Sequence, residues 1–152
     1  MTKEKQLMGK RSRAAGGRFE LKVRKDLEKN WIVGKWPNNV EFSFTLDPHV
    51  QVGKCIPAKR RYNPFSKALS IGTGFPDFFA YTTFGGVNIL HTELGEINGY
   101  HCVIFVESKM NGTLSKTEKE KARWYLENNY CSKFLIASKG DKRGEIVYTE
   151  FK

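Results

Sequence analysis

The sequence predicts a single α/β domain in which a mixed β-sheet is flanked by helices. Three observations support this class. With 152 residues the chain is long enough to bury one hydrophobic core. Its hydrophobic fraction of 39% is that of a folded protein and not of a disordered one. Helical periodicity occurs near both ends, whereas short β-branched and aromatic runs lie between and after the two helical segments.

The N-terminal part divides into an arm and a helix. Residues 1–13 are polar and basic, which predicts a flexible arm that either follows a phosphate backbone or is simply solvated. Residues 14–152 form the predicted domain. Its first helix should run from about Gly16 to Lys29, because apolar residues recur there at helical spacing. Glu20 borders this apolar stripe, a position usually occupied by a solvated residue. The stripe consists of Phe19, Val23 and Leu27.

The next segments contain a pair of strands and a proline-rich stretch. A short strand is predicted to begin at Trp31. From Glu41 to Leu46 apolar and polar residues alternate, which indicates a half-buried strand with Phe42 and Phe44 on its apolar face. Residues 47–73 are interrupted by three prolines and carry basic residues among aromatic ones, so they are predicted to be an insertion or loop. Such a mixture suits either a nucleic-acid contact or an ordered surface loop.

Two apolar strands that end in charged residues form the predicted centre of the domain. Phe75 to Phe84 is the predicted strand that carries Asp77, and Tyr100 to Lys109 is the predicted central strand. Glycines between them indicate a short polar hairpin near residues 88–96. Because strand side chains alternate, Glu107 and Lys109 should share one face.

The C-terminal third is predicted to contain a helix and two strands. Asn111-Gly112 turns the chain, and Ser115 or Thr117 could cap a helix that ends near Asn129. Two closing strands are predicted at residues 132–138 and 145–151. The order is therefore helix, strands, helix and closing strands.

Asp77, Glu107 and Lys109 are the candidate catalytic residues. Asp77 lies 30 residues before Glu107, a spacing that allows the two strands to pair and brings both acids and the lysine to one sheet edge. Paired carboxylates can hold a hard divalent cation, and the lysine can orient or deprotonate a bound water. Alternatively, the charges mark only the place where a strand emerges into solvent. A second Glu-x-Lys, at Glu20, shows how easily the tripeptide arises.

Charge and cysteine content narrow the partners and the compartment. The net charge of +10 favours a polyanion, and above all a nucleic acid. No basic amphipathic helix with a broad apolar face supports a membrane partner, and no apolar run reaches the length of a membrane span. The N-terminus lacks an apolar secretory segment. The cysteines form no C-x-x-C pair, so we expect thiols in a reducing, intracellular cytoplasm and no structural zinc. They are Cys55, Cys102 and Cys131.

These motifs resemble those of the PD-(D/E)xK nuclease superfamily. The resemblance is carried by Gly74-Phe75-Pro76-Asp77, by Glu107-Ser108-Lys109 after an apolar run, and by the Gly112 to Ser115 turn before a helix. The nearest branches are the virus-type replication-repair nuclease (VRR-NUC) modules and the archaeal and viral Holliday-junction resolvases. The resemblance covers the Glu20 helix and residues 74–138, but not residues 47–73. It departs at Glu118, where related modules often have glutamine.

The resemblance implies a restriction-endonuclease-like core of αβββαβ order and a metal-dependent deoxyribonuclease. Asp77, Glu107 and the backbone carbonyl of Ser108 would bind Mg²⁺ or Mn²⁺. Lys109 would activate the water or stabilise the transition state, and Glu20 would complete the metal or water shell. No small-molecule cofactor is implied.

The expected substrate is DNA with a junction, flap or end, in repair or recombination. The expected source is a virus or mobile element, and the expected assembly is a homodimer. Two alternatives remain: a non-catalytic, basic nucleic-acid-binding protein, and an RNA-directed nuclease of the same fold. The candidate nucleic-acid contacts are Lys10, Arg11, Arg13, Arg18, Lys59, Arg60, Arg61, Tyr62, Lys116 and Lys121.

Overall fold

The computed structural model describes most of the chain, including both helices and the main sheet. The described residues are 3–45, 51–59, 61–63, 68–70, 74–82, 90–92, 95–97 and 103–152. For some of these, among them Lys10 and Arg61, only the backbone is described. Cys102 and the candidate contact Arg60 lie outside the described residues. Within residues 47–73, the same holds for 47–50, 64–67 and 71–73.

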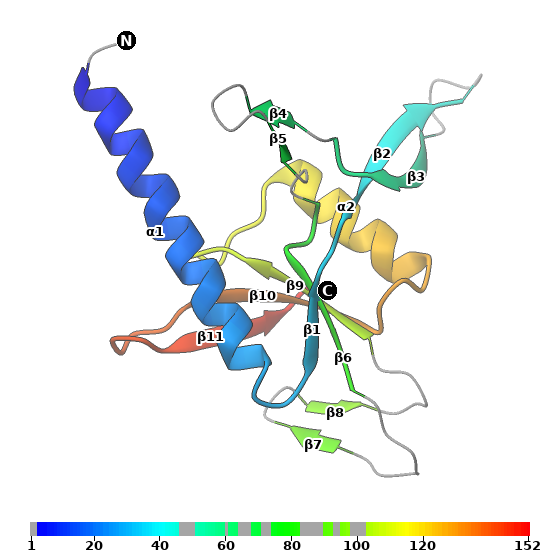
Figure 1. The fold of residues 1–152 in the computed structure, drawn as a ribbon. Coiled ribbons are helices and arrows are strands. Elements are labelled where there is room, and N and C mark those ends of the chain that lie inside the picture. The colour runs from blue at the N-terminus through cyan, green and yellow to red at the C-terminus, as the bar shows by residue number, and fades with distance from the viewer. Residues whose placement is uncertain are drawn as a thin grey trace.

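The described residues form two helices and eleven strands (Figure 1). Their bounds are α1 (Lys3–Leu27), β1 (Ile32–Lys35), β2 (Asn38–Phe44), β3 (Gln51–Pro57), β4 (Arg61–Asn63), β5 (Ala68–Ser70), β6 (Phe78–Tyr81), β7 (Leu90–Thr92), β8 (Gly95–Ile97), β9 (Val103–Ser108), α2 (Lys116–Glu127), β10 (Lys133–Lys139) and β11 (Ile146–Glu150). Five of the strands form the main sheet, in the order β1-β6-β9-β10-β11. The predicted α/β class with a mixed sheet and flanking helices is confirmed.

The main sheet is mixed because one of its four strand pairs is parallel. β9 and β10 run parallel, with α2 as the connection between them, and the other neighbouring pairs are antiparallel. Parallel neighbours need a crossover connection, which α2 provides here. Along the chain, the strands of the main sheet and the two helices therefore follow the order helix, three strands, helix and two strands.

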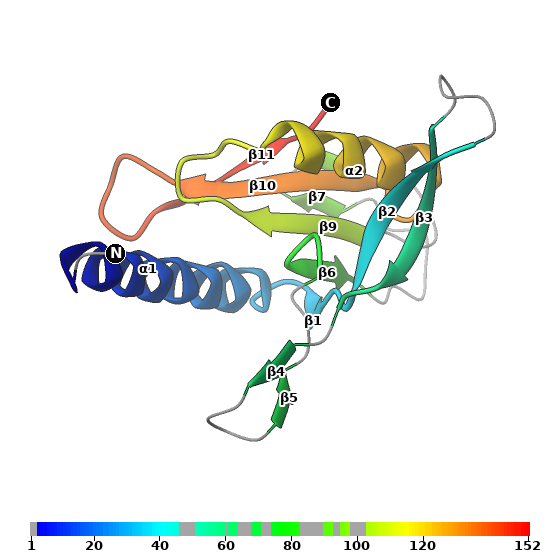
Figure 2. The ribbon, with the colours of Figure 1, turned by 90° about the horizontal axis from the view of Figure 1, so that it is seen from above.

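The two helices pack against opposite faces of the sheet (Figure 2). On one face, α1 packs through Phe19, Val23 and Leu27 against a core that includes Ile104 and Val106 of β9. On the other, α2 packs through Ala122 and Tyr125 against Phe105 and Phe134. Successive side chains of the central strand β9 thus enter different cores, as the period of two requires.

Three small hairpins lie outside the main sheet. They pair β2 with β3, β4 with β5 and β7 with β8. The third confirms the polar hairpin predicted near residues 88–96. The first two hairpins correct two expectations. Strands β3, β4 and β5 occupy parts of residues 47–73, which were predicted to be an insertion or a loop, so these parts are not loops. Phe44 of β2 is 70% exposed, although the alternation placed it on a buried face. Alternation indicates a strand, but it does not show that the main sheet covers that strand.

The first helix begins earlier than its apolar stripe predicts. α1 starts at Lys3, so the predicted start near Gly16 was wrong, and the helix is continuous through the boundary at residue 13. Lys, Arg, Leu, Ala and Glu, which recur in this helix, are good helix formers. Apolar periodicity marks only the part of a helix that packs on a core, which explains why the polar part was assigned to an arm.

The other predicted elements agree closely with the structure. β9 is the central strand, α2 begins after the N-cap Ser115, and β10 and β11 are the closing strands. Asp77 lies just before β6 and not within it. Neither described helix is both long enough and apolar enough to cross a lipid bilayer.

Candidate active site

Strand pairing brings the predicted acids to one edge of the main sheet. β6 and β9 are antiparallel with Phe78 opposite Val106, so Asp77, which precedes β6, lies beside Glu107 near the end of β9. Lys109 follows β9 directly. Glu107 comes two residues after Phe105, which belongs to the core on the α2 side, so this part of the site lies on the α2 face.

The segment that carries Asp77 is held against the chain that links β1 to β2. The backbone oxygen of Asp77 accepts a hydrogen bond from the amide of Trp36 at 3.3 Å, and the amide of Phe75 donates one to the backbone oxygen of Asn38 at 3.0 Å. A Cβ atom at Gly74 would overlap the carbonyl oxygens of Trp36 and Asn38, so only glycine fits there. The sequence Gly-Phe-Pro-Asp therefore fixes the approach of the chain to the sheet edge.

Asp77 and Glu107 are joined by reciprocal hydrogen bonds to backbone amides. The amide of Asp77 donates to Oε2 of Glu107 at 3.0 Å, and the amide of Ser108 donates to Oδ2 of Asp77 at 2.9 Å. Each strand thus supplies the amide that orients the other strand's carboxylate. Both carboxylates are positioned by the sheet before any ligand binds, which is the preorganisation that a catalytic site needs.

Burial makes both carboxylates costly to ionise. Glu107 is 6% exposed, and burial together with the charge of Asp77 raises the pKa of Glu107 to about 8 against the opposing effect of Lys109. Burial also raises the pKa of Asp77, with a further contribution from the charge of Glu20, although the hydrogen bond from Ser108 opposes it. Such a pair favours a nearby positive charge, because a cation would stabilise both ionised forms.

Lys109 lies between two carboxylates. Its Nζ is 3.2 Å from Oε1 of Glu107 and 2.6 Å from Oε1 of Glu118. Burial acts to lower the pKa of Lys109, but the hydrogen bonds and charges of Glu118 and Glu107 outweigh it, so the pKa is raised. The side chain is therefore an ammonium at neutral pH in the metal-free protein.

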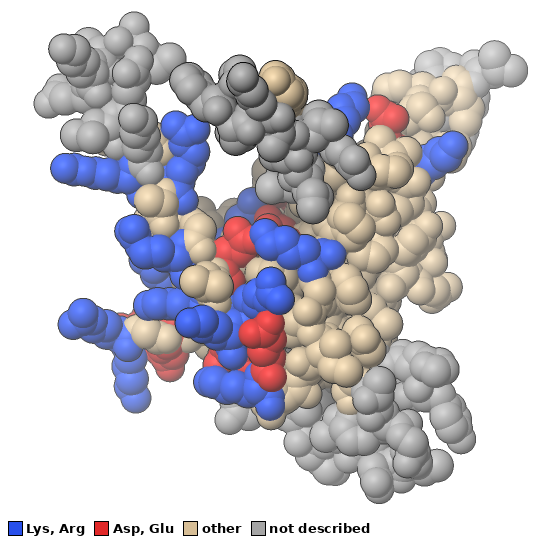
Figure 3. Space-filling view, viewed as in Figure 1, with Lys and Arg blue, Asp and Glu red and all other residues tan. Residues whose placement is uncertain are grey.

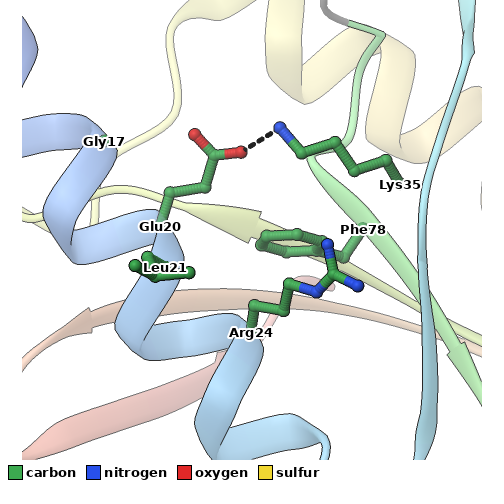
Figure 4. Close-up of a pocket in the computed structure, with 6 residues that line it drawn as sticks. All are labelled: Gly17, Glu20, Leu21, Arg24, Lys35 and Phe78. Atoms are coloured by element: carbon green, nitrogen blue, oxygen red, sulfur yellow. Dashed lines mark hydrogen bonds and ion pairs between the residues drawn. The ribbon is translucent and has the colours of Figure 1, made fainter.

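Glu20 lies across the same edge, on the α1 face. Lys35 Nζ donates to Glu20 Oε1 at 2.6 Å, and the two side chains point toward one another from α1 and β1 (Figure 4). They border a hollow of about 290 Å³. The residues that line it are Gly17, Glu20, Leu21, Arg24, Lys35 and Phe78. Glu20 acts on Asp77 through its charge, but no hydrogen bond joins their described side chains.

Asp77, Glu107 and Ser108 fit a divalent cation in two respects. Asp77 and Glu107 offer two carboxylates whose ionised forms are penalised by burial. Ser108, which follows Glu107, has a buried Oγ without a hydrogen-bond partner among the described residues. Carboxylate and other oxygen atoms are the ligands that Mg²⁺ and Mn²⁺ prefer. Within the described part of the chain, however, no three His, Cys, Asp or Glu residues are grouped around one point. Glu20 as a metal ligand stays a prediction.

The predicted nucleic-acid contacts are spread over the surface. Lys and Arg side chains gather over α1, with acidic side chains beside them (Figure 3). Arg11, Arg13 and Arg18 are exposed there, whereas the side chain of Lys10 lies outside the described part. Lys121 is engaged within the protein, since its Nζ donates to Asn39 Oδ1 at 2.8 Å and lies over the ring of Phe75.

The remaining predicted contacts lie around the small strands and at the start of α2. Lys59 is exposed after β3, and Tyr62 in β4 is 61% exposed. Arg61 belongs to β4, but its side chain is not described, and Arg60 lies outside the described residues. Lys116 is exposed as the first residue of α2. These residues do not converge on the Asp77 and Glu107 edge through any described contact.

Sequence reasoning missed two partners of the site. Lys35 gave no signal, because a lysine at the end of a short strand is ordinary. Glu118 did give one: Ser115 and Glu118 have the spacing of a capping box, which the structure contains. From the sequence, Ser115 was only one of two candidate caps, and the contact of Glu118 with Lys109 was not predicted. The β10–β11 turn also places Lys139, Lys142 and Arg143 at this end of the sheet.

Comparisons with known proteins assign no family to the chain. No protein-family model, no curated protein and no solved structure matches it. The chemistry of the site is therefore inferred from its own residues and their geometry.

Proposed function

We propose that the protein is a divalent-metal-dependent nuclease that hydrolyses phosphodiester bonds in DNA. The observation that carries this proposal is the pair of Asp77 and Glu107, each oriented by the other strand's backbone amide, with the Lys109 ammonium beside it. The order of elements in the sheet and the resemblance to the PD-(D/E)xK superfamily support a restriction-endonuclease-like core. The charge of +10 supports a polyanionic substrate.

Asp77 and Glu107 would hold the cation through carboxylate oxygens, with the backbone carbonyl of Ser108 as a further ligand. When bound, the cation would lower the pKa of a water and offset charge on the scissile phosphate. The overall reaction forms a bond between water oxygen and phosphorus and breaks the bond to the 3′ oxygen, which takes up a proton. The products are a 5′-phosphate and a 3′-hydroxyl, as the resemblance implies.

Lys109 has the clearest role among the protein's own groups. Its ammonium lies next to Glu107 and carries a charge that attracts a phosphate oxygen. A raised pKa makes it a poor proton acceptor, so stabilising the negative charge of the transition state suits it better than deprotonating water. The reciprocal hydrogen bonds keep Asp77 and Glu107 in place while the substrate binds.

The proposed substrate is branched, flapped or end-containing DNA, and the proposed assembly is a homodimer. Both follow from the resemblance to junction resolvases and VRR-NUC modules. The basic residues on α1 would contact the phosphate backbone, which predicts binding that weakens as salt increases.

The test is a cleavage assay on labelled four-way junction, flap, single-stranded and linear duplex DNA. Wild type and Asp77→Asn would each be assayed with Mg²⁺, with Mn²⁺ and with EDTA. Metal-dependent cleavage that is lost in Asp77→Asn supports the proposal. Glu127→Gln is the matched control, because Glu127 is an exposed acid at the far end of α2. Equal cleavage by Asp77→Asn and wild type would contradict the assignment.

One observation supports a second candidate, a non-catalytic nucleic-acid-binding protein. Asp77 and Glu107 already accept hydrogen bonds from backbone amides, as purely structural acids do. This candidate predicts salt-sensitive binding of every DNA substrate. It also predicts that no cleavage occurs with either metal, which the same assay would reveal.

A further inference from the structure

Glu118 uses both of its carboxylate oxygens, and each has a different partner. Oε2 accepts a hydrogen bond from the amide of Ser115 at 2.8 Å, which is one half of the capping box of α2. Oε1 accepts one from Lys109 Nζ at 2.6 Å. A capping box needs only one of these oxygens. The second is therefore available to hold the lysine.

The backbone on both sides of this contact is fixed. The amide of Lys109 donates to the oxygen of Ala137 at 2.8 Å, which ties the end of β9 to β10. Leu114, just before the N-cap, is buried in the core on the α2 side. The contact between Lys109 and Glu118 thus joins two anchored elements, and it is more than a chance pairing of two mobile surface side chains.

Glu118 also differs from the other partner of Lys109. Glu107 lies 3.2 Å from Nζ and belongs to the proposed cation site, so its oxygens would be shared with a ligand. Glu118 is closer, at 2.6 Å, and has no bond to Asp77 or Glu107 among the described contacts. Its hold on the ammonium does not compete with the cation.

We propose that Glu118 is the positioning residue of Lys109, which it keeps beside Glu107 through the oxygen that the helix cap leaves unused. The inference rests on the proposed nuclease function and deepens it. The helix cap and the orientation of the lysine then depend on one carboxylate, but through different oxygens.

Two substitutions test the helix cap and the contact with Lys109 separately. Glu118→Gln leaves one acceptor oxygen, which can complete the capping box, and then turns an amide NH₂ toward Lys109. Ser115→Ala removes the other half of the capping box but leaves Glu118 free to hold the lysine. Glu127→Gln, on the same helix, is the control for the loss of charge.

The first measurement is steady-state cleavage of the best DNA substrate in Mg²⁺. We expect Glu118→Gln to lower kcat by about 10- to 100-fold, the range for groups that orient catalytic ligands, with KM within about twofold of wild type and Tm nearly unchanged. Ser115→Ala should lower Tm and leave kcat close to wild type. A kcat for Glu118→Gln equal to or above that of wild type would overturn the inference.

The second measurement does not depend on cleavage. The metal-free proteins are treated with an amine-acetylating reagent, and modification of Lys109 is followed by peptide mass spectrometry. Lys109 should react faster in Glu118→Gln than in wild type, Ser115→Ala or Glu127→Gln. Unchanged reactivity in Glu118→Gln would show that the contact does not hold the lysine and would overturn the inference.

The outcomes distinguish this inference from the function on which it rests. If wild type cleaves DNA and Glu118→Gln cleaves equally well, only the role of Glu118 falls. If wild type cleaves no substrate with either metal, the proposed function falls and the positioning role falls with it.

Discussion

The two faces of one sheet edge hold their acids in different ways. On the α2 face, Asp77 and Glu107 are partly or fully buried and are fixed by backbone amides. On the α1 face, Glu20 depends on Lys35, whose side chain is 61% exposed. An acid fixed by sheet backbone keeps its position as firmly as the sheet itself. An acid held by one exposed lysine can exchange that partner for another at little cost.

The two faces also differ in charge balance. On the α2 face, burial raises the pKa of both acids, and the Lys109 ammonium is shared with Glu118. On the α1 face, the hollow beside Glu20 is bordered by the cations Arg24 and Lys35. The buried pair thus shares one ammonium with Glu118, whereas Glu20 has two cations beside it. This difference supports the paired acids, and not Glu20, as the proposed cation site.

The largest expected effect is on cleavage. If the protein is the proposed nuclease, Asp77→Asn and Glu107→Gln should each lower kcat by about 10³-fold or more, equivalent to about 4 kcal/mol of transition-state stabilisation, because each removes a preorganised carboxylate of the proposed cation site. Glu20→Gln should lower kcat only about tenfold, equivalent to about 1.4 kcal/mol, because Glu20 is not joined to Asp77 or Glu107 by a described hydrogen bond. Single-turnover cleavage with excess enzyme measures all three. Equal decreases in the cleavage rate for Glu20→Gln and Glu107→Gln would contradict the inference that the two faces contribute differently.

A smaller effect is expected on stability, and it depends on pH. The pKa of Glu107 is about 8 in the folded protein and ordinary when unfolded, so the folded state retains a proton that the unfolded state releases. The free energy of unfolding of the metal-free protein should therefore fall as pH rises from about 4.5 to about 8, by on the order of a few kcal/mol. Urea unfolding across this range measures it.

Glu107→Gln provides the comparison for that pH dependence. The variant has no carboxyl group to ionise at this position, so it should lose less stability than wild type as pH rises. Mg²⁺ at 100 times its Kd should raise the free energy of unfolding of wild type at pH 8 by about 2.7 kcal/mol, and that of Glu107→Gln by less. Parallel pH curves for the two proteins would show that Glu107 ionises normally.

The smallest effect is expected on the α1 face. Lys35→Met breaks the pair with Glu20, and an exposed pair contributes only about 0–1 kcal/mol. The free energy of unfolding should therefore change by less than about 1 kcal/mol, as measured by urea unfolding. Lys25→Met, at an exposed α1 position, is the control. A loss as large as that expected for the buried pair would mean that Glu20 is structurally essential.

Much of the α2 face could be predicted because its signals are local. Apolar runs located β9 and β10, and the alternation of a strand placed Glu107 and Lys109 on one side. Ser115, the N-cap in the structure, was one of two predicted caps. Pairing of β6 with β9 required only that two predicted strands be neighbours. The resulting reciprocal hydrogen bonds could not be predicted, since they depend on the register of the strands.

The α1 face could not be predicted because its partners are distant in sequence and individually ordinary. Lys35 lies 15 residues from Glu20, and only the packing of α1 across β1 brings them together. The polar start of α1 was assigned to an arm because it has no apolar stripe. The hairpin of β2 and β3 was missed in part, because its pairing partner lay in a proline-rich stretch.

The way α1 packs has a consequence for hydrogen exchange along the helix. Its buried anchors, Phe19, Val23 and Leu27, all lie in the C-terminal half, whereas Met8 is 69% exposed and an added Cβ at Gly9 or Gly16 would meet no other atom. Amides near the N-terminal end should therefore exchange through local fraying, while those beyond residue 19 should open only with the domain. Glu20 lies where these two regimes meet. A polyanion bound along α1 would slow exchange up to that point.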